Sequence, residues 1–345
     1  MTRTAENEPA ASLLPHPSAR VVRAVRRAHE AATAACAEAL AVRGWGLDAR
    51  LRALAAAHRL TGYLEGRLAP APVRWLEAQG ERIGVVVNPA RAAPHRSAGA
   101  SGSGSEPSCP LCDLPFAQLP LPLVLAGQRW RAALSPAPYT RALQYTLATR
   151  RHRPHRVGGE ADLDRLLAAM AAFLDRAPGW LLGFNQDGAG PSVPQHRHVH
   201  ALRRQPGDRL FSLARIRRRR GIWKGSGSAR EVRAQARMWW RAWRAEAGEE
   251  ATFNLVLMRG RGRFHLFFAP RRSTREMLAG LEPSRAGFLE AVLGVVVLKH
   301  PPHIEAFARG TLGADVLVCA LRAVRPQGRT TRAGRLPVGA GPAFP

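Results

Sequence analysis

The sequence predicts an α+β fold, and three observations lead to this prediction. A helix is predicted over Ala161 to Arg176, and the short apolar run that follows, Trp180 to Phe184, is typical of a buried strand. Histidines at alternate positions from His196 to His200 indicate another strand, because alternate residues of a strand point to the same face. Thr252 to Met258 and Arg263 to Pro270 flank a turn of Arg and Gly, which predicts a β-hairpin.

The N-terminal part supplies further elements between polar segments. Residues 1–17 are polar and punctuated by proline, so we expect a disordered lead, and residues 97–108 form a flexible Gly/Ser-rich insertion. The ordered elements that we expect are helix over Ser18 to Leu60, broken near Gly44 to Gly46, and strands over Glu81 to Val87, Trp130 to Leu134 and Arg141 to Ala148.

The C-terminal part begins with a basic stretch, Arg203 to Arg244, in which Arg217 to Arg220 is expected to be a solvated surface run. A helix from about Ser228 to Glu246 places Trp239 and Trp243 four residues apart, which predicts that both pack in the core. Beyond the hairpin, where His265 is expected to be structural, we predict a helix over Glu282 to Lys299, a strand over Ala314 to Leu321, and a disordered tail over 326–345.

The composition is typical of a soluble globular protein, and it excludes few classes of function. The chain has 345 residues with 46% hydrophobic content, enough for one large domain or two, and it has no apolar run of the length that crosses a membrane. Its formal charge is +27, and all but two of its basic residues are Arg, Lys224 and Lys299 being the exceptions. An Arg-rich surface suits nucleotide phosphates as well as nucleic acid, so charge does not separate these partners.

Four cysteines are too few for a disulfide scaffold in a chain of this length. Cys36 lies in an Ala-rich helical pattern and Cys319 in an apolar run, so both are expected to be buried as small hydrophobic residues. Cys109 and Cys112 form a CxxC pair. Such a pair occurs in zinc knuckles, in redox motifs and by chance, and no thioredoxin-like pattern downstream favours a redox role, so no redox cofactor is expected.

Residues 179–204 carry the strongest chemical signal in the sequence. The buried strand is followed by the loop NQDGAGPS, where glycines permit tight turns and small residues let backbone N–H groups approach a ligand. His196, His198 and His200 come next, and these are three of only 12 histidines in the chain. Neutral imidazole serves both as a metal ligand and as a nucleophile toward phosphorus, so both chemistries are open for this strand.

The pattern Asn-x-x-x-Ala-Gly-x-Ser-x-Pro-x-His-x-His-x-His over 185–200 resembles the histidine-triad superfamily. Within that superfamily it is similar to the branch that contains galactose-1-phosphate uridylyltransferase, diadenosine tetraphosphate phosphorylase and GDP-hexose phosphorylases. That branch usually has Gln where this chain has His200. The resemblance implies an α+β fold with a mainly antiparallel sheet and flanking helices, built from two degenerate repeats. It divides the chain into a catalytic half, 18–205, and a second half, 206–325, which begins with the basic helix and lacks the triad.

The resemblance also implies roles for individual residues. The middle histidine, His198, would attack the α-phosphorus of a nucleotide and become nucleotidylated, while His200 would hold the phosphoryl oxygens or protonate the leaving group. His196 would be a zinc ligand or an orienting neighbour. The expected substrate-binding residues belong to the loop and to the segment NPAR that follows the first strand, where Arg91 either reaches a phosphate or solvates a turn. These residues are Asn185, Gly188, Gly190, Ser192 and Arg91.

A structural zinc ion is a second implication of the resemblance. In the uridylyltransferases zinc is held by a CxxC pair, a later histidine and the first histidine of the triad. Carried over to this sequence, the four ligands are Cys109, Cys112, His152 and His196, with His155 as an alternative to His152. Relatives often have His-x-Pro-Gln at this place, and this chain has His155 for the Gln.

The functional hypothesis is therefore a cytoplasmic nucleotidyltransferase or phosphorylase. Its expected substrates are a nucleoside diphosphate sugar or a dinucleoside polyphosphate together with phosphate or a sugar phosphate, and a homodimer is compatible with the sequence. Two alternatives stay open. The same triad could transfer the nucleotidyl group to water and act as a hydrolase, or the chain could be a non-enzymatic Arg-rich nucleic-acid binder, which the absence of an RRM or KH signature disfavours.

Overall fold

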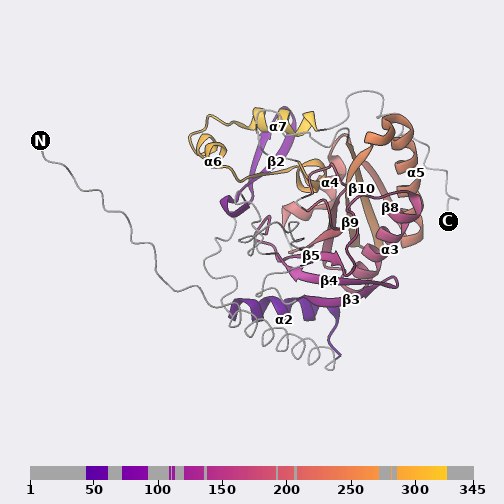
Figure 1. Ribbon diagram of the computed structural model, residues 1–345. Helices are drawn as coiled ribbons and strands as arrows, with labels where there is room; N and C mark the ends of the chain where they lie inside the picture. Colours follow the sequence, from indigo (N-terminus) through magenta and orange to yellow (C-terminus); the bar gives the residue numbers. More distant parts are fainter. Residues whose placement is uncertain are drawn as a thin grey trace, which may run out of the picture.

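In a computed structural model, the chain forms two sheets with helices packed on their outer faces (Figure 1). The structure describes residues 44–60, 72–91, 109, 111–112, 120–135, 138–191, 193–205, 208–271, 281 and 286–324. The predicted lead 1–17, the insertion 97–108, the tail 326–345, Cys36 and Ser192 lie outside the described residues.

The larger sheet has eight strands in the order β3-β4-β5-β7-β6-β9-β10-β8, and every neighbouring pair is antiparallel. This confirms the mainly antiparallel sheet that the sequence led us to expect. The strands are β3 (Leu121–Leu125), β4 (Gln128–Leu134), β5 (Gln144–Thr149), β6 (Trp180–Asn185), β7 (His198–Arg203), β8 (Trp223–Gly227), β9 (Thr252–Gly260) and β10 (Arg263–Arg271).

β6 lies at the centre of this sheet because its sequence WLLGFN is apolar enough to be covered on both faces. Leu182 pairs with Ala201 of β7 on one side and with Leu257 of β9 on the other. The strands of the two predicted halves therefore belong to one continuous sheet. The division near residue 205 stays a prediction.

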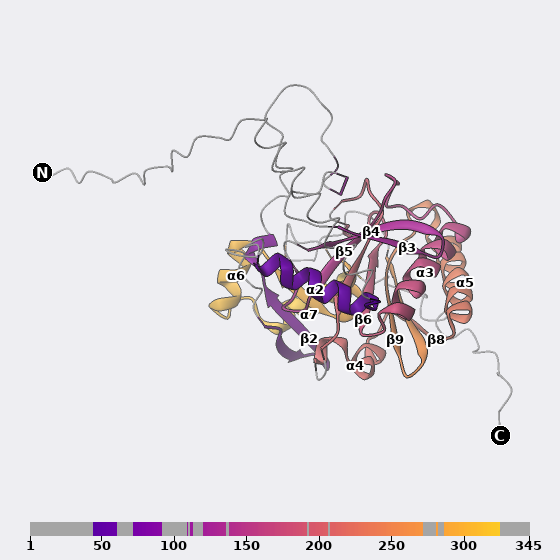
Figure 2. The same ribbon diagram turned by 90° about the horizontal axis from the view of Figure 1, so that it is seen from below.

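Three helices pack on one face of the sheet: α2 (Leu47–Leu60), α3 (Glu160–Arg176) and α5 (Ala229–Ala247). Figure 2 shows α3 and α5 beside each other at the right of the strands. α5 begins at a capping box in which Ser228 and Glu231 exchange hydrogen bonds between side chain and backbone, so its first turn has its N–H groups satisfied. Trp239 and Trp243 are buried as predicted, which anchors α5 to the sheet.

The opposite face carries a three-stranded sheet of β1 (Arg74–Ala78), β2 (Glu81–Val87) and β11 (Val295–Leu298), with β11 parallel to β2. Short helical elements complete this side of the molecule. They are Pro89–Arg91, Arg209–Phe211, α4 (Leu213–Arg218), the π-helical turn Leu289–Leu293, α6 (Pro301–Ala308) and α7 (Ala314–Ala323). The short turn Gly248–Glu250 instead follows α5 on the other face. Within the described residues, no helix combines the length and the apolar character that crossing a bilayer requires.

Two predicted elements near the C-terminus are wrong. The helix expected over Glu282 to Lys299 ends at Gly294, whose φ of 62° suits glycine, and the β-branched run after it forms β11. The strand expected over Ala314 to Leu321 is the helix α7, because its apolar residues recur at helical spacing and pack on the small sheet. Cys319 accordingly lies on the exposed face of α7 and is not buried.

Candidate active site

The predicted triad straddles the start of β7. His198 and His200 lie on this strand, while His196 lies in the turn before it, so the prediction of one strand carrying all three imidazoles holds only for the last two. Val199 points into the core beneath α3, which places His198 and His200 on the opposite face, toward the π-helical turn. Their rings meet edge to face with centroids 5.1 Å apart.

The ring of His198 is held in one orientation by its own backbone neighbourhood. Its Nδ1 lies 2.8 Å from the carbonyl oxygen of His196, and because a carbonyl only accepts, Nδ1 carries the hydrogen. The neutral ring then has its lone pair on Nε2. His198 is 2% exposed, and the neighbouring rings are imidazoles rather than aliphatic side chains. This arrangement suits a nucleophile whose attacking atom is Nε2.

His155 also holds His198 in place. It does not belong to the group of side chains that could bind a metal ion. Its ring stacks on that of His198 with centroids 4.2 Å apart and an interplanar angle of 25°, and it also lies against Phe184. Its Nδ1 accepts the backbone N–H of His198 at 3.1 Å. Burial lowers the pKa of His155 well below its usual value, and the charges of His198 and His200 lower it further. The ring of His155 therefore stays neutral.

The buried state of His155 predicts that the protein loses stability in mild acid. The unfolded chain protonates this imidazole near pH 6.5, whereas the folded chain, with its lowered pKa, does not. The unfolded state then binds more protons, so the free energy of unfolding falls as the pH drops below about 6.5, by up to about 1.4 kcal/mol per pH unit.

Urea unfolding of the wild type and of His155→Gln is measured at pH 7.5 and at pH 5.5. Because His196 titrates in both proteins, the difference between their losses of stability gives the contribution of His155. We expect the variant to lose less stability than the wild type between the two pH values. Equal losses would show that His155 is not the group responsible.

His200 is fixed by an aromatic and amide cage. The Tyr139 hydroxyl lies 3.4 Å from its Nε2, and the Gln144 side-chain nitrogen lies 3.5 Å from its Nδ1. Phe288 stacks on the ring with centroids 5.7 Å apart. Phe288 can lie there because the facing residue of β6 is Gly183, where a Cβ atom would come within 2.4 Å of the phenyl ring. Position 183 therefore requires glycine.

Arg91 reaches this cage through Tyr139. Its guanidinium carbon lies 3.8 Å from the centre of the Tyr139 ring, a cation–π contact. Burial raises the pKa of the Tyr139 hydroxyl, and the charge of Arg91 opposes this only in part, so the phenol keeps its proton. The predicted phosphate-binding arginine thus lies beside His200, and a contact with phosphate remains a prediction.

Asn185 belongs to a buried polar network. Its Oδ1 accepts from the Asn254 side chain at 2.9 Å and from the backbone N–H of Phe288 at 2.7 Å. Asn254 donates to the Ala189 carbonyl at 2.8 Å and accepts from the buried Arg271 at 3.0 Å. This network fixes the loop to β9 and to the segment that carries Phe288, and a contact between Asn185 and a substrate stays a prediction.

The loop glycines meet two different demands. Gly188 and Gly190 have φ angles of 85° and 82°, a region where side chains other than glycine are strained. At Gly190 a Cβ atom would also lie 2.3 Å from the Ala286 carbonyl oxygen, so the loop packs directly on the backbone of the segment that carries Phe288. Loop and segment are therefore positioned together beside the two histidines.

Arg197, between the histidines, anchors the start of β7 to α3. Its guanidinium makes a bidentate pair with Asp162 at 2.6 and 2.7 Å and also donates to the Arg156 carbonyl. Burial alone would raise the pKa of Asp162, but hydrogen bonds and the charge of Arg197 hold it below its usual value. The pair therefore stays charged and keeps the triad segment in register with the helix.

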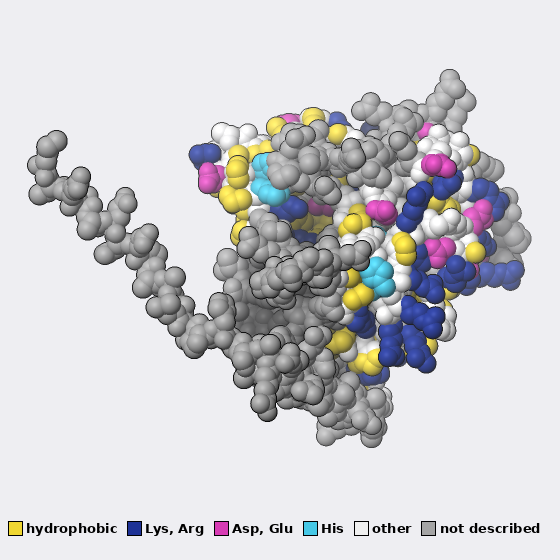
Figure 3. All heavy atoms as spheres, in the orientation of Figure 1, with side chains coloured by type: hydrophobic (Ala, Val, Ile, Leu, Met, Phe, Trp, Pro, Cys, Tyr) yellow, Lys and Arg dark blue, Asp and Glu magenta, His cyan; other side chains and the backbone are white. Residues whose placement is uncertain are grey.

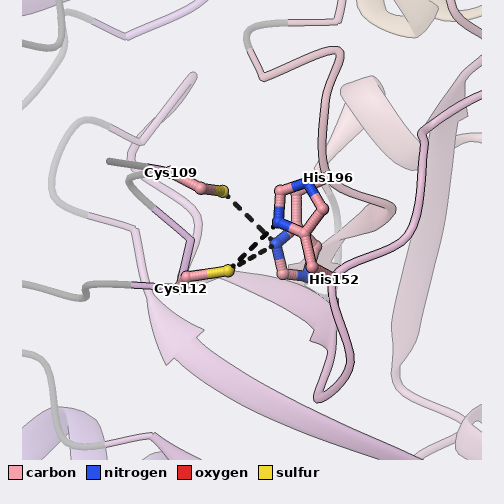
Figure 4. A group of neighbouring side chains, drawn as sticks. All are labelled: Cys109, Cys112, His152 and His196. Atoms are coloured by element: carbon pink, nitrogen blue, oxygen red, sulfur yellow. Dashed lines mark hydrogen bonds between the residues drawn. The ribbon is translucent and has the colours of Figure 1, made fainter. Parts of the chain in front are cut away.

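Cys109, Cys112, His152 and His196 converge beside the triad, and their sulfur and nitrogen atoms all lie within 4.8 Å of one another (Figure 4). Nδ1 of His196 is 3.3 Å from each sulfur, and Nδ1 of His152 is 3.2 Å from the sulfur of Cys112. Two thiols and two imidazoles are the donor set of many tetrahedral zinc sites. The structure thus brings together the four residues that the sequence named and leaves out the alternative, His155.

The orientation of the His196 ring makes this group of four side chains suitable for binding a metal ion. Its Nε2 lies 2.8 Å from the Thr149 carbonyl and donates to it, which leaves Nδ1 as a lone-pair donor facing the sulfurs. Burial lowers the pKa of His196, and nearby His152 and Arg131 lower it further, so the ring is neutral as a ligand must be. Because the backbone carbonyl of His196 orients His198, the cluster is directly linked to the His198 ring.

Sequence reasoning missed the residues from distant segments that surround the two histidines and the loop. They are Tyr139, Phe288, Asn254 and Arg271. Asn254 gave a signal, since it is the one strongly polar side chain within the apolar run from Phe253 to Met258. The others gave none, because an aromatic or an arginine is ordinary in a core strand or a basic chain.

Comparison with known proteins supports the fold. No protein-family model and no curated protein sequence matches the chain. Among solved structures, yeast Ap4A phosphorylase Apa2 in complex with Ap4A aligns with a TM-score of 0.54 at 12% identity, covering 80% of this chain and 96% of that one. Its complex with AMP gives 0.52 at 12% identity, covering 80% and 94%. A uridylyltransferase gives only 0.33 at 13% identity, covering 74% and 100%.

Proposed function

We propose that the chain is a nucleotidyltransferase or phosphorylase that acts through a nucleotidylated His198. The observation that carries the proposal is the orientation of the His198 ring, whose Nδ1–H is held by the His196 carbonyl and whose Nε2 is thereby available to attack. The shared fold with yeast Ap4A phosphorylase, a protein solved with Ap4A and with AMP, supports a phosphate anhydride of a nucleotide as substrate.

The reaction consists of two displacements at the α-phosphorus. In the first, Nε2 of His198 forms a bond to the α-phosphorus while the bond to the bridging oxygen breaks. The leaving group, which is a nucleoside triphosphate from Ap4A or a sugar phosphate from a nucleoside diphosphate sugar, takes that electron pair. In the second, phosphate or a sugar phosphate attacks, and the bond to Nε2 breaks. The Nδ1–H held by the His196 carbonyl stabilises the positive charge that the ring carries in the intermediate.

Other residues around His198 would bind the phosphate groups, stabilise their charge and protonate the leaving group. Backbone N–H groups of the loop with Gly188 and Gly190, together with Ser192, would stabilise negative charge on the equatorial oxygens. Arg91 would contact a phosphate from the side of Tyr139. His200, held by Tyr139 and Gln144, would bind the phosphoryl oxygens or protonate the departing oxygen.

We further propose that Cys109, Cys112, His152 and His196 hold a structural zinc ion. Four protein ligands complete a tetrahedral shell, so the ion would stabilise the fold and supply no open position for chemistry. By fixing His196 on both sides, through Nδ1 and through the Thr149 carbonyl, the cluster would keep the His196 backbone carbonyl in place for His198.

A substrate panel tests the proposed reaction. The purified protein is incubated with Ap4A and with nucleoside diphosphate sugars, each with and without phosphate, and the products are separated chromatographically. We expect at least one substrate to be cleaved, and phosphate to accelerate the cleavage and to appear in a nucleoside diphosphate product. Cleavage to a nucleoside monophosphate at a rate independent of phosphate would instead identify a hydrolase, and no cleavage of any substrate would contradict the proposal.

A further inference from the structure

A cavity of about 770 Å³ lies between the β1–β2 hairpin and the segment 209–220, away from the triad. β2 and α4 border it and lie beside each other in both ribbon views (Figures 1 and 2). Its volume is within the range of cavities that take small-molecule ligands. Six arginines line it: Arg82, Arg209, Arg215, Arg218, Arg219 and Arg220.

The acidic residues of this cavity do not balance its arginines. Only Glu77 and Glu81 line it, and each already has a basic partner: Glu77 pairs with Arg82 at 3.5 Å, and Glu81 lies 2.9 Å from Arg322. Glu81 is also 3.5 Å from Arg219.

The remaining positive charges belong to Arg215 and to three exposed arginines, Arg209, Arg218 and Arg220. Within the described part of the chain, none of these three exposed arginines forms an ion pair with an acidic residue. A concave surface with several uncompensated positive charges attracts anions.

The floor of the cavity consists of Trp75 and Arg215, and the guanidinium groups of Arg215 and Arg82 cover the Trp75 ring. Arg215 donates to the carbonyls of Arg209 and Leu210 at 3.1 and 2.8 Å, and its guanidinium carbon lies 4.7 Å from the centre of the Trp75 ring. The Arg82 guanidinium lies 5.9 Å from the same ring. Burial lowers the pKa of Arg215 to about 10, which still leaves it charged at neutral pH. Because these guanidinium groups cover the Trp75 ring, a nucleobase cannot stack on it. The phosphate groups of a ligand must therefore make the contacts with the cavity.

We propose that this cavity is a second site, separate from the histidines of β7, that binds a small condensed-phosphate anion such as tripolyphosphate or the triphosphate group of a nucleotide. Arg209, Arg218 and Arg220 supply the charge-assisted hydrogen bonds over the fixed floor of Trp75 and Arg215. β2 separates the two sites: its first residue, Glu81, borders the cavity, and its last lies near Arg91, about 20 Å along the strand.

The shape and charge of the surface favour a small anion over a nucleic acid. Figure 3 shows that basic side chains also gather on the face near α3 and α5. Several arginines of those helices are already neutralised, since Arg233 and Arg237 pair with Asp164 and Arg241 pairs with Glu160. The uncompensated charge of the cavity is instead concentrated in one hollow, which suits a compact ligand with several charges.

Calorimetric titration of the full chain with tripolyphosphate at fixed ionic strength tests the proposal. The test variant is Arg218→Gln/Arg220→Gln, and Arg209→Gln is an independent second variant on the other side of the cavity. The matched control, Arg129→Gln/Arg230→Gln, removes the same number of charges from exposed positions on β4 and α5. Thermal unfolding of each variant verifies that it is folded.

We expect the control to bind like the wild type and the Arg218/Arg220 variant to bind at least about tenfold more weakly, since a contact worth 1.4 kcal/mol is one such factor. His198→Ala should bind tripolyphosphate normally, so this result is independent of the proposed catalytic function. Equal weakening in both double variants, or no saturable binding, would overturn the proposal. So would tighter, Arg218/Arg220-dependent binding of a single-stranded oligonucleotide, which would identify a nucleic-acid site.

Discussion

Replacing His198 with alanine is expected to lower kcat on the cleaved substrate by at least about ten-thousand-fold, while the protein stays folded. The substitution removes the only atom that forms the covalent bond to phosphorus in our account, so no partial pathway through the same intermediate remains. KM for the nucleotide should change much less, because the loop and Arg91 contacts are retained. Steady-state kinetics on the substrate identified by the panel measure both quantities.

The matched control for this substitution is His303→Ala. His303 lies on α6, which packs with the small sheet and is separate from the triad strand β7. We expect this variant to keep kcat within about twofold of the wild type, because His303 is half-buried on α6 and its ring contacts His300 rather than the triad. A His198→Ala protein that keeps more than a hundredth of the wild-type kcat would show that His198 is not the nucleophile.

Removing the two thiols with Cys109→Ser/Cys112→Ser is expected to abolish stoichiometric zinc and to lower both stability and activity. A ligand at a thousand times its Kd stabilises the folded state by about 4 kcal/mol, so the melting temperature should fall by roughly 10 °C. kcat should fall as well, because His196 links the cluster to the ring of His198 through its backbone carbonyl. Elemental analysis, thermal unfolding and kinetics give the three readouts.

Cys319→Ser is the control, since Cys319 is an exposed thiol on α7 outside the cluster. It should retain one zinc per chain and the wild-type melting temperature. Two results would contradict the structural metal site. One is a wild-type protein that contains no zinc although it is purified under metal-replete conditions, and the other is a double variant that melts like the wild type.

The central strands of the fold could be predicted because their sequences carry a local pattern that tertiary packing reinforces. β6 is a short apolar run before turn residues, and the β9–β10 hairpin flanks the turn at Arg261 and Gly262. The C-terminal part is harder to predict, because a short apolar run such as ADVLVCALRA fits a strand or a helix. In α7 the buried residues recur at helical spacing and pack against the small sheet, and this packing decides in favour of the helix.

The candidate site shows the same division. The histidines, the loop glycines and the cysteine pair lie in recognisable motifs, and the structure places them together. The residues that orient them come from far along the chain: Phe288 is 88 positions after His200, and its place depends on the absence of a side chain at Gly183. The stacking of His155 on His198 could not be predicted either, since the sequence suggested metal binding for it.

Trapping the covalent intermediate is the most direct test of the account. The protein is mixed with its substrate labelled at the α-phosphorus, in the absence of phosphate or another acceptor, and is then digested and mapped by mass spectrometry under alkaline conditions that preserve a phosphoramidate. We expect a nucleoside monophosphate attached to His198, which disappears when phosphate is added. A labelled histidine other than His198, or active protein that never carries the label, would contradict the account.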